Sequence, residues 1–293
     1  MKQITVISGK GGTGKTVVTG SLAALAENKV MADCDVDAAD LHLLLHPEIK
    51  EKHEFKGSKK AIIDEEKCTL CKRCIETCRF DAIINDQSAI LVDPLSCEGC
   101  GACSLVCPEG AIDLKEEVTG EWFVSGTKYG TMVHAELEIA QENSGKLVSV
   151  VREKAKDIAL KEGLDYVIID GPPGIGCPVI ASLSGIDIAL VVTEPTLSGI
   201  HDLKRIIGVC QHFGINEIYV CINKFDLSIT NSHQIEKYCK GIGIQAPIKI
   251  PYNEEVIESV VKGMPYVEYS SDETADKIKE LWQRIKNASS LAF

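Results

Sequence analysis

Eight of the 13 cysteines fall into two runs that share one spacing. Three cysteines separated by two residues each, with a fourth after three more residues, form the pattern that holds paired [4Fe–4S] clusters, and the fourth cysteine of each run binds the other cluster. Two zinc sites of four cysteines each are the alternative, although zinc sites more often use two separated CxxC pairs. We therefore expect one [4Fe–4S] cluster on Cys68, Cys71, Cys74 and Cys107, and a second on Cys97, Cys100, Cys103 and Cys78.

The two runs belong to an internal duplication with an offset of 29 residues, which also matches Asp64 with Asp93. Strand patterns of one α/β unit lie on both sides of the duplication, so we expect it to be an insertion. The predicted organisation is a bacterial-type two-cluster ferredoxin domain at 61–115, inserted into a larger domain formed by 1–60 and 116–293. The copies differ where Arg79 follows Cys78 but Pro108 follows Cys107, a charge expected to shift the potential of the second cluster.

A second group of residues is suited to bind phosphate. The sequence GKGGTGKT, at 9–16, follows a short apolar run and precedes a helical pattern, which is the context of a Walker A loop. Its backbone N–H groups can turn toward phosphate oxygens, and the helix N-terminus adds a partial positive charge. We expect Lys15 to contact the β- and γ-phosphates and the Thr16 hydroxyl to bind Mg²⁺. The predicted nucleotide contacts in the loop are Gly9, Gly11, Gly12, Thr13, Gly14, Lys15 and Thr16.

A carboxylate suited to hold the same metal ion ends a later apolar run. Asp170 closes the stretch that begins at Tyr166 and is followed by Gly171-Pro172-Pro173-Gly174. This position fits the Walker B motif, whose carboxylate holds Mg²⁺ directly or through water. We therefore predict that Asp170 is a Mg²⁺ ligand.

The elements that must position these residues alternate between short β-branched runs and helical patterns. Such alternation predicts an α/β fold with a mostly parallel sheet that helices cover on both faces. The last helix has four apolar residues on one face, which favours docking on the core over a membrane-targeting role. Strands are expected at 4–7, 30–32, 166–170, 187–193, 217–223 and 247–251, and helices at 16–26, 144–162 and 272–286.

The second lysine of the loop, Lys10, gives the chain a resemblance to a known family. GKGGTGKT resembles the deviant Walker A motif of the MinD/ParA/Mrp ATPases, a group of P-loop ATPases that includes the nitrogenase iron protein. The resemblance covers the α/β part and extends to Asp33-Cys34-Asp35, Asp170-Gly-Pro-Pro-Gly174, Thr193-Glu194-Pro195-Thr196, Asn223-Lys224 and Ile250-Pro251-Tyr252. The chain as a whole is similar to MinD-superfamily ATPases with an inserted ferredoxin domain.

This resemblance implies roles for single residues. Lys10 would reach across a homodimer, formed with ATP, to the nucleotide of the second subunit. Asp35 would orient the attacking water, a role that the nearby Asp37 and Asp40 could share. Asn223 would contact the base, and Pro251 would also lie at the nucleotide.

Two features leave alternatives open. Asn223-Lys224-Phe225-Asp226 also matches the NKxD motif of GTPases, but we prefer ATP because the resembling family binds it. Cys177 stands where the nitrogenase iron protein has a cysteine that binds a cluster between subunits. No second cysteine completes such a site here, so ordinary burial is the alternative. The remaining cysteines Cys210, Cys221 and Cys239 are expected to be small core residues.

Charge and composition exclude several classes of partner. The net charge of −12 argues against binding to nucleic acid or to an anionic membrane. We find no signal peptide pattern and no apolar stretch of the roughly 20 residues that a membrane span needs. We therefore expect a cytoplasmic protein in a reducing compartment, with clustered cysteines that bind metal rather than form disulfides.

Together these features predict an iron–sulfur protein that binds and hydrolyses ATP. It would couple nucleotide-dependent dimerisation to electron transfer, or to delivery of an iron–sulfur or other metallocluster, with a redox or metallocofactor-assembly protein as its partner. The alternative is a ParA/MinD-like positioning ATPase whose clusters sense redox state. A plain electron carrier with a vestigial ATPase core is a third option, which the intact Lys15, Thr16, Asp35 and Asp170 disfavour.

Overall fold

The structure, a computed structural model, describes residues 1–138 and 144–289. The chain divides into two compact units, each described here by itself. The larger unit comprises Met1–His53, Trp122–Glu136 and the chain from Ser144 onward. The smaller unit comprises Glu54–Glu121 and a short stretch that begins at Leu137.

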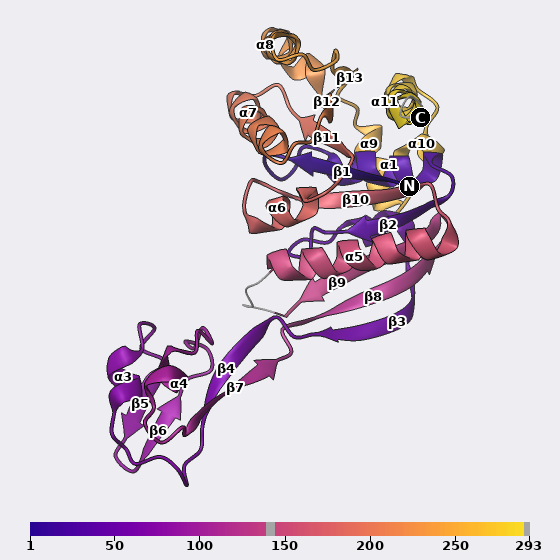
Figure 1. The fold of residues 1–293 in the computed structure, drawn as a ribbon. Coiled ribbons are helices and arrows are strands. Elements are labelled where there is room, and N and C mark those ends of the chain that lie inside the picture. Colours follow the sequence, from indigo (N-terminus) through magenta and orange to yellow (C-terminus); the bar gives the residue numbers. More distant parts are fainter. Residues whose placement is uncertain (139–143, 290–293) are drawn as a thin grey trace. The chain divides into compact units, whose positions relative to one another are not determined.

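The larger unit is built around a sheet with nine strands among the described residues (Figure 1). Every pairing from β13 to β9 is parallel. The inner strands are continuous buried runs, as in β1, because helices cover both faces of the sheet. In spatial order the strands are β13 (Ile248–Ile250), β12 (Glu217–Asn223), β11 (Ile188–Thr193), β1 (Lys2–Ser8), β10 (Tyr166–Pro173), β2 (Lys29–Asp33), β9 (Gly130–Leu137), β8 (Gly120–Thr127) and β3 (Glu48–Phe55).

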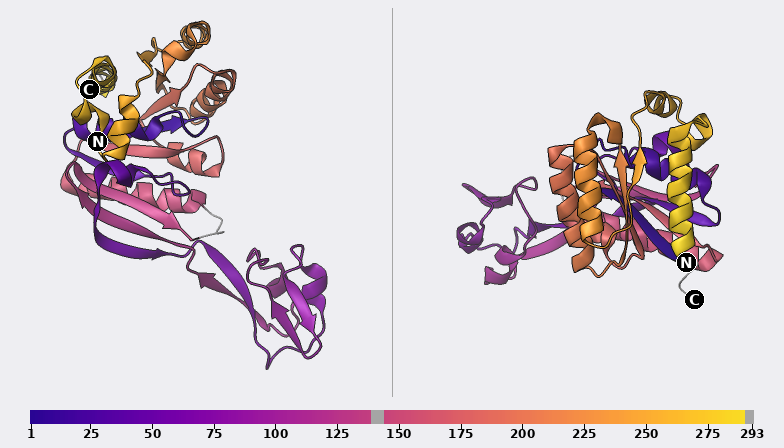
Figure 2. Two further views of the ribbon diagram at one scale, coloured as in Figure 1. Left: turned by 180° about the vertical axis from the view of Figure 1, so that it is seen from behind. Right: turned by 90° about the horizontal axis from the view of Figure 1, so that it is seen from above.

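Helices lie on both faces of this sheet (Figure 2). One face packs against α1 (Lys15–Leu25), α2 (Leu41–Leu45), α10 (Tyr266–Tyr269) and α11 (Glu273–Ser289). The other face is covered by α5 (Ser144–Glu162), α6 (Cys177–Leu183) and α7 (Leu197–His212). The remaining elements of this unit are η1 (Phe225–Leu227), α8 (Ile229–Gly241) and α9 (Glu255–Val261). The α/β fold with a mostly parallel sheet between two helical layers is therefore as predicted.

The sequence did not predict the three strands β3, β8 and β9. β3 has the sequence EIKEKHEF, whose charged residues are mostly exposed, and it forms the edge of the sheet. Such a strand lacks the apolar run that marks a buried parallel strand, and charges are a common way to protect an open edge. The smaller unit is inserted between β3 and β8, which are neighbours in the sheet.

The smaller unit repeats one small motif twice. β4 (Ser58–Ile63) pairs with β7 (Ile112–Glu117), and β5 (Ile83–Asp86) pairs with β6 (Ala89–Val92), both antiparallel. The two helices, α3 (Arg73–Thr77) and α4 (Ala102–Val106), are related by the same 29-residue offset as the cysteines. Equivalent backbone bonds join Asp64 N to the Ala111 carbonyl and Asp93 N to the Ala82 carbonyl, at 2.8 and 2.7 Å. The duplication therefore holds in the backbone as well as in the sequence.

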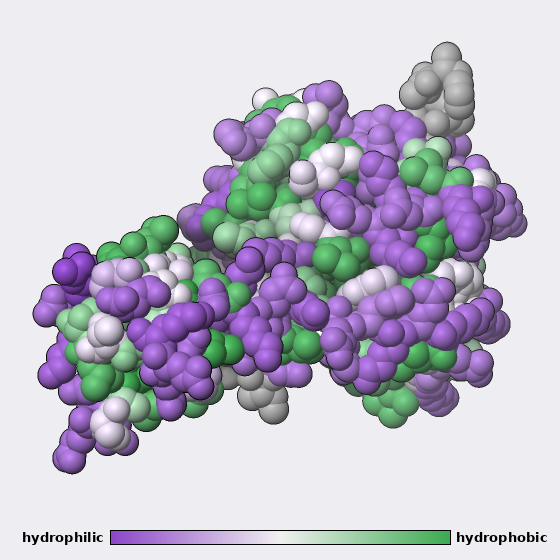
Figure 3. Space-filling view, turned by 60° about the horizontal axis from the view of Figure 1, so that its bottom comes forward, coloured by the Kyte–Doolittle hydropathy of each residue, from purple (hydrophilic) through white to green (hydrophobic). Residues whose placement is uncertain are grey.

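The helices and one face of the surface bear on the expected absence of a membrane span. In the part of the chain that the structure describes, no helix is both long enough and apolar enough to cross a membrane. On the face drawn in Figure 3, hydrophobic residues are interspersed with hydrophilic ones. The apolar face of α11, formed by Ile278, Leu281, Trp282 and Ile285, is buried in the core of the larger unit. The last helix is thus docked on the core, as expected.

Candidate functional site

The glycine-rich loop follows β1 and leads directly into α1. Gly12 and Gly14 have φ values of 76° and 87°, which side chains with a Cβ rarely adopt, and Gly14 is the residue from which α1 starts. A Cβ on Gly14 would also collide with the amide of Asn223. The loop therefore turns its backbone at the N-terminus of a helix, which is the arrangement that binds phosphate.

Lys15 is buried at the base of this loop among carboxylates. Its Nζ lies 2.9 Å from Oδ1 of Asp170 and 3.4 Å from Oδ2 of Asp35. Burial alone would lower the pKa of Lys15, but Asp170, Asp35 and Asp33 outweigh it, so the pKa is raised. The lysine is therefore charged and held by one carboxylate from within β10 and one from just after the neighbouring strand β2.

Asp170 collects three side-chain donors and is fully buried. Besides Lys15, the hydroxyl of Thr16 donates to its Oδ2 at 2.9 Å, and the hydroxyl of Thr19 donates to its Oδ1 at 2.8 Å. The structure thus brings together Thr16 and Asp170, the two predicted Mg²⁺ ligands. Sequence reasoning missed Thr19, although its position four residues after Lys15 places it on the same side of α1.

Asp33 is a second carboxylate that the sequence reasoning did not assign. The register of β2 and β10 sets Asp33 beside Asp170, and it is almost completely buried. Its Oδ1 accepts the N–H of Asp35 at 3.1 Å, whereas its Oδ2 has no hydrogen-bond partner in the described structure. Burial and the charge of Asp170 raise the pKa of Asp33 well above its usual range. The site therefore concentrates negative charge around one lysine.

The acidic residues after β2 are not equivalent. Asp35 is buried, and burial raises its pKa against the opposing effect of Lys15. Asp37 and Asp40 are exposed, and no contact joins either of them to Lys15 in the described structure. Of the three residues considered for positioning water, the structure brings Asp35 alone to the P-loop lysine.

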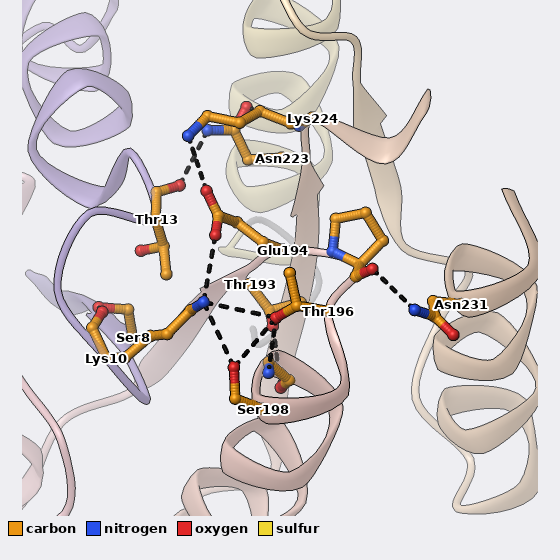
Figure 4. A network of polar contacts seen from close by, with 12 residues as sticks. Ser8, Lys10, Thr13, Thr193, Glu194, Thr196, Ser198, Asn223, Lys224 and Asn231 are labelled. Carbon is orange, nitrogen blue, oxygen red and sulfur yellow. Dashed lines mark hydrogen bonds and ion pairs between the residues drawn. The ribbon is translucent and has the colours of Figure 1, made fainter. Parts of the chain in front are cut away.

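Lys10 contacts a different set of residues, on the segment that follows β11 (Figure 4). Its Nζ lies 3.3 Å from Oε2 of Glu194, 3.4 Å from Oγ1 of Thr196 and 3.5 Å from Oγ of Ser198. Glu194 also pairs with Lys224, at 2.7 Å, so one carboxylate is shared by two lysines. These contacts hold Lys10 against the loop between β11 and α7 and leave a third of its side chain exposed.

Of the two residues predicted at the nucleotide base, Asn223 contacts the P-loop. The Asn223 amide donates to the Thr13 carbonyl at 2.8 Å, which ties the end of β12 to the P-loop. Asp226, the last residue of the NKxD-like stretch, accepts the backbone N–H of Tyr252 at 2.7 Å. This bond fixes the chain just after Pro251 next to η1. A GTPase with the NKxD motif would use this aspartate to bind guanine, whereas here its carboxylate already accepts the N–H of Tyr252.

The eight cysteines of the smaller unit line two small cavities. One cavity is bordered by Cys68, Cys71, Cys74 and Cys107, and the other by Cys78, Cys97, Cys100 and Cys103. Each set contains three cysteines of one run and the last cysteine of the other. Between the sulfurs the cavity walls are largely apolar, with Ile63, Ile90 and Ile112 around the first and Ala61, Phe80 and Leu114 around the second.

The cysteine loops have matching backbone turns and reduced thiols. Leu70 and Lys72 have positive φ values, and so do their counterparts Gly99 and Gly101. All 13 cysteines are free. Burial raises the pKa of Cys74 and of Cys103. In the described residues, no group of three or more His, Cys, Asp or Glu side chains is gathered so that it could hold a metal ion.

The cysteines outside the two runs differ among themselves. Cys210, Cys221 and Cys239 are buried, as expected for small core residues. Cys177, the first residue of α6, is exposed, so the expectation of ordinary burial does not hold for it. Cys34 is fully buried between two aspartates, and burial raises the pKa of its thiol.

Comparison with known proteins identifies the class to which this fold and site belong. Residues 4–266 match the CobQ/CobB/MinD/ParA nucleotide binding domain. An uncharacterized protein of Methanocaldococcus jannaschii is 32% identical over 97% of this chain and 96% of its own length. The chain therefore belongs to the CobQ/CobB/MinD/ParA family of P-loop nucleotide-binding domains, as the resemblance predicted.

More distant matches extend the comparison. The septum site-determining protein MinD of Synechocystis is 24% identical over 90% of this chain and 81% of its own length. MinD of Pyrococcus horikoshii, solved with Mg-ADP, superposes with a TM-score of 0.58 at 18% identity, over 99% of this chain and 98% of that one. A separate match of 50 residues, 17% of this chain, is 44% identical to part of the indolepyruvate oxidoreductase subunit IorA of Methanothermobacter marburgensis, of which it covers 8%.

Proposed function

We propose that the larger unit binds ATP with Mg²⁺, dimerises in that state and hydrolyses ATP, as a MinD/ParA-like ATPase that acts on a partner protein. The observation that carries this proposal is the cluster formed by Lys15, Thr16, Asp35 and Asp170 at the end of β1, β2 and β10. In this cluster, carboxylates neutralise Lys15, the residue with which a phosphate-binding loop contacts the β- and γ-phosphates. Membership of the family supports the same conclusion.

ATP binding would exchange the partners within this cluster. Phosphate oxygens would replace the carboxylates as partners of Lys15. Thr16 and Asp170, whose side-chain oxygens lie 2.9 Å apart, would hold Mg²⁺. Asp35 is released from Lys15 and becomes available to accept a hydrogen bond from the attacking water. We assign the base contact to Asn223, whose amide lies against the P-loop, and to Pro251.

We place Lys10 at the dimer interface. Its contacts with Glu194, Thr196 and Ser198 keep it out of the carboxylate cluster of its own subunit, which supports a role toward a second subunit. A cation supplied in this way would neutralise charge on the γ-phosphate, as an arginine finger does. Dimerisation would then depend on ATP, because ADP lacks that phosphate.

We further propose that the smaller unit is an inserted ferredoxin domain with two [4Fe–4S] clusters. The observation that favours it is the division of the eight cysteines into two cavities, each with the ligand set of one cluster. Three cysteines, two alanines and three isoleucines form the central buried cluster of this unit. A unit of about 75 residues with such a core ordinarily gains much of its stability from a metal or disulfides. When bound, the clusters would supply one-electron chemistry.

The two units allow two roles in the cell. The matched proteins whose names state a role are mostly MinD proteins, and they favour a MinD-like positioning ATPase. In such a protein the clusters would sense redox state. The cysteine cavities are the specific observation in favour of a second candidate, which is electron transfer or cluster delivery to a redox or metallocofactor-assembly partner. Both roles begin with the same ATP-dependent dimer.

One experiment tests the ATPase and separates the two roles. The dimer fraction is measured by sedimentation with ATP and with ADP, on anaerobically reconstituted protein that is either oxidised or reduced by dithionite. A dimer whose ATP dependence changes with redox state supports sensing. A dimer that is indifferent to redox state, but whose clusters are reoxidised by an added acceptor faster with ATP, supports electron transfer. No ATP-dependent dimer in either redox state would contradict the proposed ATPase.

A further inference from the structure

One lysine of the smaller unit lies against the second cysteine run. Lys60 belongs to β4, and its Nζ donates a hydrogen bond to the backbone carbonyl of Cys97 at 2.7 Å. The same strand also approaches the residues that follow, because a Cβ on Gly99 would collide with the backbone carbonyl of Lys59. β4 therefore packs directly on the backbone that carries Cys97, and it brings a positive charge to that place.

The ammonium group of Lys60 is largely shielded from water. The side chain is only 20% exposed. Its neighbour Ala61 lines the second cysteine cavity together with Cys97, so Lys60 is held at the wall of that cavity. Glu117 is the carboxylate that pairs with Lys60, but at 3.9 Å the pair is long and 37% of the glutamate side chain is exposed. Glu117 therefore offsets the charge of Lys60 only in part.

The internal duplication supplies a matched comparison. At the 29-residue offset, Lys60 of β4 corresponds to Ala89 of β6, which has no charge and no side-chain donor. Gly99 corresponds to Leu70, and the two residues have similar φ values of 61° and 57°. The first cysteine loop thus makes the same turn without the glycine and without the lysine. The fold of a cysteine loop does not require Lys60, and its charge acts on one run alone.

The other charged residues that border the cavities or adjoin their cysteines are exposed. They are Glu98 and Arg79 at the second cavity, and Glu109, Lys67, Lys72 and Arg73 at the first. Water and salt screen the field of exposed side chains far more strongly than the field of a largely buried one. Among these charges, Lys60 is therefore the one whose field reaches a cysteine cavity with the least screening.

We propose that Lys60 raises the reduction potential of the cluster on Cys97, Cys100, Cys103 and Cys78, and that it has little effect on the other cluster. The inference rests on the iron–sulfur clusters of the proposed function. On reduction this cluster gains one electron and goes from the 2+ to the 1+ state, with no proton transferred. A fixed positive charge stabilises the more negative reduced state, and charge near the sulfurs is one of the factors that set such potentials. Lys60 thereby biases an electron shared by the two clusters toward the second one.

The test is an anaerobic redox titration of the reconstituted full-length protein. Dithionite and mediators supply the electrons, and EPR spectroscopy follows the reduced clusters. Lys60→Met removes the charge but keeps a long side chain, whereas Lys60→Arg keeps the charge. Ala89→Met introduces the same residue at the equivalent position and is the matched control.

We expect Lys60→Met to shift one of the two midpoint potentials to a more negative value. At a fixed potential, the ratio of reduced to oxidised cluster in that transition should fall about threefold or more. If the two transitions overlap in the wild type, Lys60→Met should separate them. Lys60→Arg and Ala89→Met should keep both potentials close to those of the wild type. A purely structural role of Lys60 would not shift one potential and leave the other in place.

Two cysteine variants identify the cluster that responds. In a Cys71→Ser background only the second cluster remains, and Lys60→Met should lower its potential. In a Cys100→Ser background only the first cluster remains, and Lys60→Met should change its potential little. A shift confined to the Cys100→Ser background would overturn the assignment of Lys60 to the second cluster.

Failure of the clusters and failure of the inference give different results. If the reconstituted wild type shows no reducible signal, the iron–sulfur clusters of the proposed function are refuted. If two clusters are reduced but Lys60→Met leaves both potentials unchanged, or lowers both equally, the clusters stand and the role of Lys60 is overturned. A decrease of the same size in Ala89→Met would overturn that role as well.

Discussion

Replacing Glu194 by Gln is expected to strengthen ATP-dependent dimerisation, because Glu194 retains Lys10 within its own subunit. The Nζ of Lys10 lies 3.3 Å from Oε2 of Glu194 and must leave this carboxylate before it can reach a nucleotide in a second subunit. A partly exposed ion pair of this kind contributes about 0.2–1 kcal/mol. Glu194→Gln keeps the side-chain length and removes the charge. Because a homodimer contains two such pairs, the dimer Kd should fall by about 2- to 30-fold.

The assay is sedimentation over a range of concentrations with ATP, in an Asp35→Asn background where slow hydrolysis preserves the dimer. Lys10→Ala provides the decisive comparison, because Glu194→Gln should have no effect when Lys10 is absent. Ser198→Ala, which removes only the contact at 3.5 Å, is the matched control and should change little. A higher Kd for Glu194→Gln, or the same decrease in the Lys10→Ala background, would refute the restraining role of Glu194.

Three other substitutions test the site and the cysteines. Lys15→Ala should abolish tight binding of a fluorescent ATP analogue and also lower the Tm, because it leaves the buried carboxylates of Asp170 and Asp35 unpaired; an unchanged Tm would contradict the ion pairs. Asp33→Asn should raise the Tm at pH 8. Because the pKa of Asp33 is raised in the folded protein, the wild type loses stability as the pH rises through that pKa. The gain in Tm from Asp33→Asn should therefore shrink toward pH 4. An equal gain at pH 8 and pH 4 would contradict the buried charge. Cys71→Ser should lower the iron content of reconstituted protein from about eight toward about four per chain; two zinc ions and no reducible chromophore in the wild type would refute the clusters.

Features encoded by adjacent residues could be predicted from the sequence. The P-loop, the apolar run that carries Asp170, and the two cysteine runs each depend on local spacing, although that strand continues past Asp170 to Pro173. The buried β-branched runs likewise predicted the inner strands and the fold class. The helix at 144–162 was predicted with the ends that the structure shows.

Features that depend on pairing between distant segments could not be predicted. Asp33 is assigned to the site by the register of β2 with β10, and Glu194 by its contacts with Lys10 and Lys224. Neither the strand register nor these ion pairs produce a periodic pattern in the sequence. The strand β3 was not predicted because an edge strand with alternating charges resembles a solvated loop in the sequence.

The segment that links the nucleotide site to the smaller unit is firmly anchored, and this affects how ATP can influence the cysteines. After Asp35 the chain forms α2 and then β3, which leads into the smaller unit. Leu41, Leu44 and Leu45 of α2 are buried, and Leu44 lies so close to Gly20 of α1 that no Cβ would fit there without displacement.

A helix held by three buried leucines resists a local shift, since exposing even one costs about 1.5–3 kcal/mol. Binding of ATP to a single subunit should therefore change the smaller unit little, and the effect should arise when a second subunit adds its own contacts. Lys10→Ala, which leaves ATP binding intact but removes the proposed contact across the dimer, provides the test. It should abolish any ATP-dependent change in the rate at which iron chelators extract the clusters. An ATP effect of wild-type size in monomeric Lys10→Ala protein would show that the signal passes through α2 within one chain.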